Sequence, residues 1–173
     1  MGFRTQSRLS EPMEITLEDP EAQVAFGARL APLFPRRLVI YLEGDLGTGK
    51  TTLVRGILRG LGHHGSVRSP TYTLIEPYEL PEARVYHLDL YRLADSEELE
   101  YLGLRDLSAE YALILVEWPE RGLGALPAPD LTISLRYEAP GRHLTLMAVT
   151  PEGAALVAAL SGGPGSPVRF PSA

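Results

Sequence analysis

The segment "GDLGTGKT", residues 44–51, constrains the fold of this chain more than any other part of its sequence. It matches the phosphate-binding pattern G-x-x-x-x-G-K-[ST] without a gap. The apolar run "RLVIYLEG" enters it, and "GKTTLVRGILRGLG" leaves it with Leu53, Ile57 and Leu61 on one helical stripe. A strand, a glycine-rich turn and a helix in this order predict a loop whose backbone N–H groups, aided by the positive end of the helix, face one anion.

The chain contains a single lysine, Lys50, and it lies inside this loop. Lysine and arginine together number 16, so the other fifteen basic side chains are arginines. Arginine ends in a wide planar fork, whereas lysine carries a compact charge on a slim stem. Lysine therefore fits a narrow loop and reaches the β- and γ-phosphates of a nucleotide, and the hydroxyl of Thr51 can ligate Mg²⁺. The pattern predicts a nucleotide-phosphate site rather than a chance glycine-rich turn.

The composition excludes several kinds of chemistry and of binding partner. The chain of 173 residues has no cysteine, which excludes disulfides, thiol catalysis and thiolate metal sites and fits a cytoplasmic location. Its net charge of −6 argues against a protein that grips nucleic acid by itself. No stretch approaches eighteen consecutive apolar residues, so we expect no membrane span and no membrane partner.

The order of the local signals predicts a single P-loop NTPase-like domain, α/β in class, with a mixed central sheet flanked by helices. We expect a flexible N-terminus over 1–12, the domain over 13–161 and a disordered, Gly/Pro/Ser-rich tail over 162–173. Asp19 and Ser96 are the expected caps of two helices. The predicted strands cover 13–17, 37–44, 72–80, 83–93, 111–118, 130–138 and 142–150, and the predicted helices cover 19–34, 49–62, 96–104 and 151–162.

Two carboxylates are candidates to complete the site. Glu117 directly follows the apolar run 112–116, which places it at the carboxyl end of a buried strand, the edge where the phosphate loop also opens. It either holds a metal or is an ordinary acid at a strand end. Asp89 shares a strand face with His87 and Tyr91, where an acid costs free energy unless it is paired or binds a cation. Its structural alternative is an ion pair with an arginine such as Arg92, and His87 alone is more often a core histidine than a catalyst.

The segment "SPTYTL", residues 69–74, follows the phosphate-loop helix. Thr71 and Thr73 alternate on what we expect to be an extended segment. Either they belong to a switch-type element that closes on Mg²⁺ and the γ-phosphate, or they are threonines that simply favour a strand.

Five motifs in order, "GDLGTGKTT", "SPTYTLIEPY", "YHLDLYRL", "EELEYLGLRD" and "LILVEWPE", resemble one family. It is TsaE, the bacterial ATPase family of tRNA threonylcarbamoyladenosine biosynthesis. The resemblance covers residues 42–120 and includes no departure within the motifs.

The resemblance implies a protein that binds ATP with Mg²⁺ and hydrolyses it slowly. It implies two partner proteins that install threonylcarbamoyl on N6 of adenosine 37 in tRNAs reading codons that begin with A. A member of the family does not transfer the group itself; its ATP turnover resets the partner complex, and its contact with tRNA is indirect. On this resemblance Lys50, Asp89 and Glu117 are the catalytic residues, and Thr51 and Glu117 hold Mg²⁺. The nucleotide contacts it implies are Asp45, Leu46, Gly47, Thr48, Gly49, Lys50, Thr51, Thr52, Asp89, Trp118, Glu120 and Arg142.

Three other functions compete with this interpretation. A GTPase commonly reads guanine with a motif that includes a lysine outside the phosphate loop, and this chain has no second lysine. A small-molecule or nucleotide kinase usually adds an arginine-bearing lid, and no inserted lid is visible between Thr51 and Ala112. A nonenzymatic adaptor would bind the nucleotide without turnover, even with its partners present.

Overall fold

The structure is a computed structural model of the whole chain, and it describes residues 11–108, 111–161 and 168–170. Its strands are β1 (Met13–Leu17), β2 (Leu38–Glu43), β3 (Ile75–Glu79), β4 (Arg84–Asp89), β5 (Leu113–Glu117), β6 (Leu131–Glu138), β7 (Gly141–Ala148) and β8 (Val168–Phe170). Its helices are α1 (Pro20–Leu30), α2 (Lys50–Gly60), α3 (Glu97–Tyr101), α4 (Leu104–Ser108) and α5 (Pro151–Ser161), with 3₁₀ turns η1 (Ala31–Leu33) and η2 (Pro119–Gly122).

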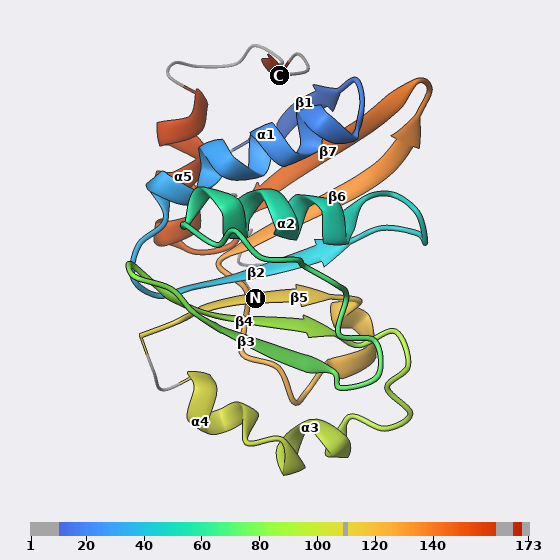
Figure 1. Cartoon of the computed structure of the whole chain (residues 1–173), viewed down its shortest axis with the longest axis vertical. Coiled ribbons are helices and arrows are strands. Elements are labelled where there is room, and N and C mark those ends of the chain that lie inside the picture. The colour runs from blue at the N-terminus through green and yellow to red at the C-terminus, as the bar shows by residue number, and fades with distance from the viewer. Residues whose placement is uncertain (1–10, 109–110, 162–167, 171–173) are drawn as a thin grey trace, which may run out of the picture.

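The strands form one mixed sheet in the order β3-β4-β5-β2-β6-β7-β1-β8 (Figure 1). The neighbours β4, β5, β2 and β6 run parallel, while β3 pairs antiparallel with β4 and the β6–β7–β1 group is antiparallel. Helices flank this sheet, so the predicted α/β class with a P-loop NTPase-like fold is confirmed. The parallel strands end at one edge, and the segment 44–49 connects β2 to α2 at that edge.

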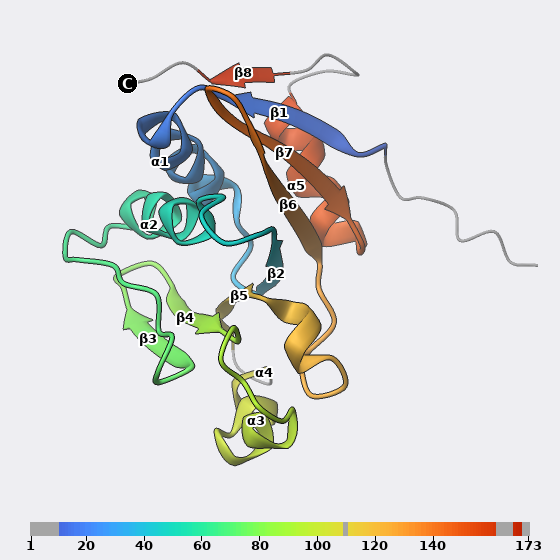
Figure 2. The same ribbon diagram turned by 90° about the vertical axis from the view of Figure 1, so that its right-hand side faces the viewer.

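One hydrophobic cluster covers one face of the sheet, and a second covers the opposite face at β2, β4 and β5. Helices α1 and α2 lie side by side against one face (Figure 2), and Phe26 and Ile57 are fully buried there. In the other cluster, the face of β4 and β5 that points away from α1 and α2 packs against Leu99 of α3, Leu104 of α4 and the partly buried Trp118 beside η2. The strands β4 and β5 are therefore covered on both faces, which agrees with their apolar sequences.

Helices α1 and α2 approach closely because glycines lie at their contact. A Cβ atom on Gly56 would lie 2.3 Å from the carbonyl oxygen of Val24, and one on Gly27 would lie 2.7 Å from the backbone nitrogen of Ile57. Any side chain at these positions would force the helices apart. The helix that begins at the phosphate loop is thus fixed by its neighbour along its length.

Most predicted elements are confirmed, but the strand predicted over 83–93 ends at Asp89, so Tyr91 lies in a turn rather than on the strand face of His87, and α4 was not predicted. Asp19 caps α1 by accepting a hydrogen bond from the Ala22 amide at 2.8 Å, as expected. Ser96 makes no capping hydrogen bond among the described residues; Asp95 Oδ1 instead accepts one from the Glu97 amide at 3.0 Å, so the preceding carboxylate takes the role expected of the serine. The segment 71–73 is a turn rather than an extended segment, since the Leu74 amide donates a hydrogen bond to the Pro70 carbonyl at 2.8 Å.

The predicted ends of the chain lie largely outside the described residues. Residues 1–10, 162–167 and 171–173 are not described. Within the predicted tail, Val168–Phe170 forms β8, which pairs in parallel with β1. No helix in the described part of the chain has the length and apolar character needed to cross a membrane.

The outermost strand on the β3 side carries a proline in its middle. Pro77 lies opposite Tyr86 in the antiparallel pair of β3 and β4. Leu80 donates to the Ala83 carbonyl and Asp89 donates to the Leu74 carbonyl, so the alternation of the ladder places Pro77 at a position that faces away from β4. The ladder therefore loses no hydrogen bond to this proline.

Candidate functional site

A cleft of about 360 Å³ opens at the carboxyl ends of β2, β4 and β5. In the parallel register Glu117 lies opposite Leu42 on one side and Asp89 on the other, so both candidate carboxylates come from adjacent strand ends. The residues that line the cleft are Leu46, Gly47, Gly49, Lys50, Thr51, Thr52, Ser69, Thr71, Asp89, Tyr91, Glu117 and Trp118.

Lys50 begins α2 and is only 5% exposed. Its ammonium donates to the carbonyl oxygens of Gly44 and of Asp45, the latter at 2.9 Å, and lies 4.3 Å from the centroid of the Trp118 ring. Burial lowers the pKa of Lys50, while the nearby carboxylates, Glu117 foremost, act in the opposite direction. The only ammonium side chain of the protein is thus folded back on its own loop, beside the cleft.

Two side chains from outside the loop hold the backbone of the phosphate loop. Gln23 of α1 donates to the Thr48 carbonyl at 3.1 Å, and Arg142 of β7 donates to the same oxygen at 3.2 Å. Arg142 also donates to the Gly47 carbonyl at 3.0 Å. Gly49 has φ 96°, and a Cβ atom there would lie 2.2 Å from Gln23 Nε2, so a side chain would strain the backbone and displace the Gln23 amide from the loop. These contacts fix the curl of the loop backbone.

Glu117 lies between Thr51 and His87. The Thr51 hydroxyl is 3.0 Å from both carboxylate oxygens, and His87 Nε2 is 2.5 Å from Oε2. The Glu117 side chain is 3% exposed and that of His87 is fully buried. A carboxylate this deeply buried needs such partners, because removing its charge from water is costly.

Asp89 holds the segment 69–74 at several points. Its Oδ2 accepts hydrogen bonds from the Ser69 hydroxyl and, at 3.4 Å, from Thr71, while its amide donates to the Leu74 carbonyl at 3.0 Å. Its Oδ1 accepts from the Tyr91 amide at 3.0 Å. The guanidinium of Arg92 lies instead over the ring of Tyr72, at 4.7 Å. Among the described contacts Asp89 therefore has hydroxyl and amide partners, and the alternative of an ion pair with Arg92 does not hold.

The other predicted nucleotide contacts divide into two groups. Trp118 lines the cleft and packs on Tyr91 with ring centroids 5.0 Å apart. Asp45, Thr48, Glu120 and Arg142 do not line it. The Asp45 carbonyl accepts from the Thr48 hydroxyl at 2.8 Å, so these two residues shape the loop from within. Glu120 is exposed.

The oxygen atoms at the edge of the cleft are suitable ligands for a magnesium ion. Mg²⁺ prefers oxygen ligands and usually keeps several waters, so one hydroxyl and one or two carboxylates suffice on the protein side. Thr51 and Glu117 supply a hydroxyl and a carboxylate in contact with each other, and Asp89 is the next carboxylate along the same edge. The described residues contain no cluster of three or more His, Cys, Asp or Glu side chains of the kind that holds a metal by itself.

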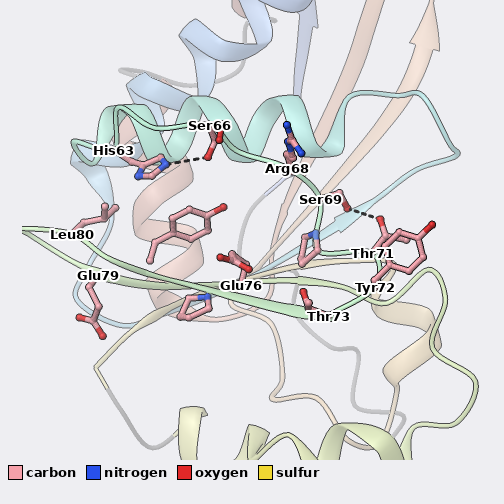
Figure 3. A pocket seen from close by; sticks show the side chains of 13 residues that line it. His63, Ser66, Arg68, Ser69, Thr71, Tyr72, Thr73, Glu76, Glu79 and Leu80 are labelled. Atoms are coloured by element: carbon pink, nitrogen blue, oxygen red, sulfur yellow. Dashed lines mark hydrogen bonds between the residues drawn. The ribbon is translucent and has the colours of Figure 1, made fainter.

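A second cavity of about 600 Å³ adjoins the cleft (Figure 3). Ser69 and Thr71 line both, and in Figure 3 they lie at one end while His63 and Leu80 lie at the other. The His63 and Tyr78 rings meet edge to face, with centroids 5.0 Å apart. The 69–74 segment is therefore a wall shared by two cavities.

Sequence reasoning missed Gln23 and Ser69 and did not foresee the partner of His87. Gln23 lies on the buried face of a helix, and a buried amide between apolar neighbours is a signal that it has a polar partner elsewhere. Ser69 gave no signal, since serine before proline is ordinary in a loop.

Comparison with known proteins gives consistent similarities. The sequence model of the family described as threonylcarbamoyl adenosine biosynthesis protein TsaE matches residues 17–144. The chain is 43% identical over 150 residues to the tRNA threonylcarbamoyladenosine biosynthesis protein TsaE of Haemophilus influenzae, covering 84% of this chain and 95% of the relative. It is 37% identical over 132 residues to the protein of the same name from Bacillus subtilis, with 76% and 82% covered. The crystal structure of Bacillus subtilis YdiB superposes with a TM-score of 0.74 at 32% identity, covering 88% of this chain and 95% of that one.

Proposed function

The chain belongs to the TsaE family of threonylcarbamoyl adenosine biosynthesis proteins, and from this premise we propose that it binds ATP with Mg²⁺ and hydrolyses it slowly. It acts in the threonylcarbamoyl modification of adenosine 37 in tRNA, together with two partner proteins. Its ATP turnover resets the partner complex, and its contact with tRNA passes through the partners. We place this activity in the cytoplasm.

One observation carries the proposal. The single lysine, the following threonine and two buried carboxylates line one cleft at the end of three strands. Phosphate oxygens would replace the Gly44 and Asp45 carbonyls as partners of Lys50, which exchanges neutral acceptors for charged ones. Thr51 and Glu117 are the residues that would hold Mg²⁺, which neutralises phosphate charge when bound. Asp89 is suited to orient the attacking water, because its carboxylate is held by hydroxyl groups rather than by a cation.

The competing functions have less support in the described residues. No segment of them between Thr51 and Ala112 forms an added lid over the cleft. Lys50 is committed to the phosphate loop, so no lysine remains to read guanine. We therefore expect preference for ATP over GTP and hydrolysis rather than transfer to a small acceptor.

Calorimetry of the purified protein with ATP and GTP, each with and without Mg²⁺, tests the core of the proposal. We expect tighter binding of ATP than of GTP, and Glu117→Ala should weaken Mg²⁺-dependent binding more than Mg²⁺-free binding. Equal affinities for the two nucleotides would refute the specificity. Equal losses with and without Mg²⁺ would make Glu117 a structural residue.

Co-purification tests the part that concerns partners. The two other modification proteins should bind the chain in a manner that ATP governs, and turnover should rise in their presence. Incubating the protein with ATP and candidate small acceptors should yield ADP and phosphate only. Phosphorylation of an acceptor would assign the chain to the kinases instead.

A further inference from the structure

The buried histidine below the cleft has one polar contact among the described residues, and that contact is Glu117. His87 Nε2 lies 2.5 Å from Glu117 Oε2, and His87 Nδ1 is buried with no hydrogen-bond partner in the described part of the chain. A histidine kept only for packing would normally satisfy both nitrogens or be replaced by an apolar residue of similar size. The placement of its one hydrogen bond therefore needs a reason.

Strand register gives the layering of the site. His87 lies opposite Leu115 on β5, and Asp89, two residues further, lies opposite Glu117. His87 and Asp89 share one face of β4, so His87 sits one layer deeper than the two carboxylates. From that depth its ring reaches up to Glu117, whose oxygens also contact the Thr51 hydroxyl at 3.0 Å.

We infer that His87 is a positioning residue that donates from Nε2 to Glu117 and turns this carboxylate toward Thr51, the place where Mg²⁺ would be held. The inference rests on the function proposed above. The direction of the hydrogen bond follows from the two partners, since a ring N–H donates and a carboxylate accepts.

The arrangement has a clear physical effect. With Thr51 and His87 on two sides, the carboxylate cannot rotate away from the cleft, so a cation meets an oriented ligand. Partners of this kind, which touch a metal ligand rather than the metal, typically change metal affinity by about 10- to 100-fold when removed.

Two substitutions of similar polarity separate positioning from packing. The amide of glutamine is on a longer stem and can place a donor near the Nε2 position, whereas the amide of asparagine is too short to reach Glu117. We expect His87→Gln to keep most of the gain in ATP affinity that Mg²⁺ produces, and His87→Asn to lose about 10- to 100-fold of it. Binding of ATP without Mg²⁺ should change little in either variant. Calorimetry with and without Mg²⁺ gives both quantities.

Leu115→Val is the matched control, because Leu115 is buried directly opposite His87 and carries no polar group. It should lower the melting temperature without altering the effect of Mg²⁺. In the Glu117→Gln background, a further His87→Asn change should leave the Mg²⁺ effect as it is, since the histidine acts through the carboxylate.

The outcomes are distinguishable. A wild-type protein whose ATP affinity does not respond to Mg²⁺ would remove the metal from the proposed function and the role of His87 with it. A wild-type response that His87→Asn leaves intact, or that both His87 variants lose equally, would overturn the positioning role alone. A loss in His87→Asn that persists in the Glu117→Gln background would also overturn it.

Discussion

The phosphate loop and the segment 69–74 both line the cleft, but different contacts hold them. The loop is anchored from outside the cleft, by Gln23 and Arg142 on its carbonyls and by the close packing of α2 on α1. The segment 69–74 is anchored from inside, through Asp89, whose carboxylate itself lines the cleft. A ligand leaves the first set of anchors in place, whereas any group that engages Asp89 competes with Ser69 and Thr71.

This difference separates two properties of the site. The contacts of Gln23 and Arg142 fix the loop backbone without any ligand, so the proposed phosphate site would be preorganised. The segment 69–74 contains Leu74 at φ 68°, a conformation that costs a non-glycine residue free energy and persists only while its surroundings hold it. We therefore expect its position to depend on what Asp89 binds.

Removing the lysine of the phosphate loop should have the largest effect on ATP binding. We expect Lys50→Ala to weaken ATP binding on the order of 10³-fold, because two charge-assisted contacts to phosphate are lost. Arg59→Ala is the matched control, since Arg59 is an exposed basic residue of the same helix. Calorimetry measures the ATP affinity of both variants. An undiminished affinity in Lys50→Ala would contradict the assignment of residues 44–51 as a phosphate loop.

Asp89→Asn should act on the segment 69–74 and on hydrolysis. It keeps size and shape but removes the charge, so we expect ATP to bind while partner-stimulated hydrolysis falls about 10²-fold. Amide exchange in 69–74 should accelerate while exchange in 44–51 stays the same. Ser69→Ala, which keeps the carboxylate, should reproduce the faster exchange with a smaller loss of turnover. Normal turnover together with unchanged exchange in Asp89→Asn contradicts both the chemical and the anchoring role.

Arg142→Ala tests whether Arg142 holds the phosphate loop, as its contacts indicate. Losing two hydrogen bonds to loop carbonyls should weaken ATP binding by about tenfold and speed amide exchange at Gly47 and Thr48 before any nucleotide is added. Arg136→Ala, an exposed arginine on the neighbouring strand, is the control. Weaker binding with unchanged exchange in the free protein would mean that Arg142 touches the nucleotide directly.

The smallest effect concerns pH. Burial lowers the pKa of Lys50, and bound phosphate favours the charged form and raises it again. ATP affinity should therefore be constant below the lowered pKa and fall as pH rises through it, by at most about tenfold per pH unit. Over the same range the free folded protein gains stability, because the unfolded chain still binds the proton that Lys50 has lost. Calorimetry across alkaline pH should show proton uptake on binding, and its absence would contradict this account.

Much of the fold follows from local sequence signals. The apolar runs that became β2 and β5, the Asp19 cap and the glycine-rich turn are each decided by a few adjacent residues, so pattern alone predicts them. Most residues that line the cleft could be predicted for the same reason, since strand ends and loop positions are visible along the chain, and Ser69 is an exception.

The missed features depend on contacts between distant parts of the chain. The carbonyl partners of Arg142 lie 94 and 95 residues away in the sequence, and the Glu117 partner of His87 lies 30 residues away. No local pattern encodes such pairs, because they arise only when the sheet order sets β7 near the loop and β4 beside β5. The turn at 71–73 was missed because threonine favours strands, whereas here its hydroxyl contacts Asp89 and a tertiary contact outweighs propensity.

Pro77 has a consequence for how this molecule behaves when crowded. The free edge of a sheet is a template on which another extended chain can pair, and this makes outer strands sites of aggregation. Midway along β3 the outward-facing position carries a ring with no N–H to offer, so an incoming strand would find its hydrogen-bond ladder interrupted there. We therefore expect β3 to be a poor seed for fibrils, because one residue interrupts pairing at this edge of the sheet.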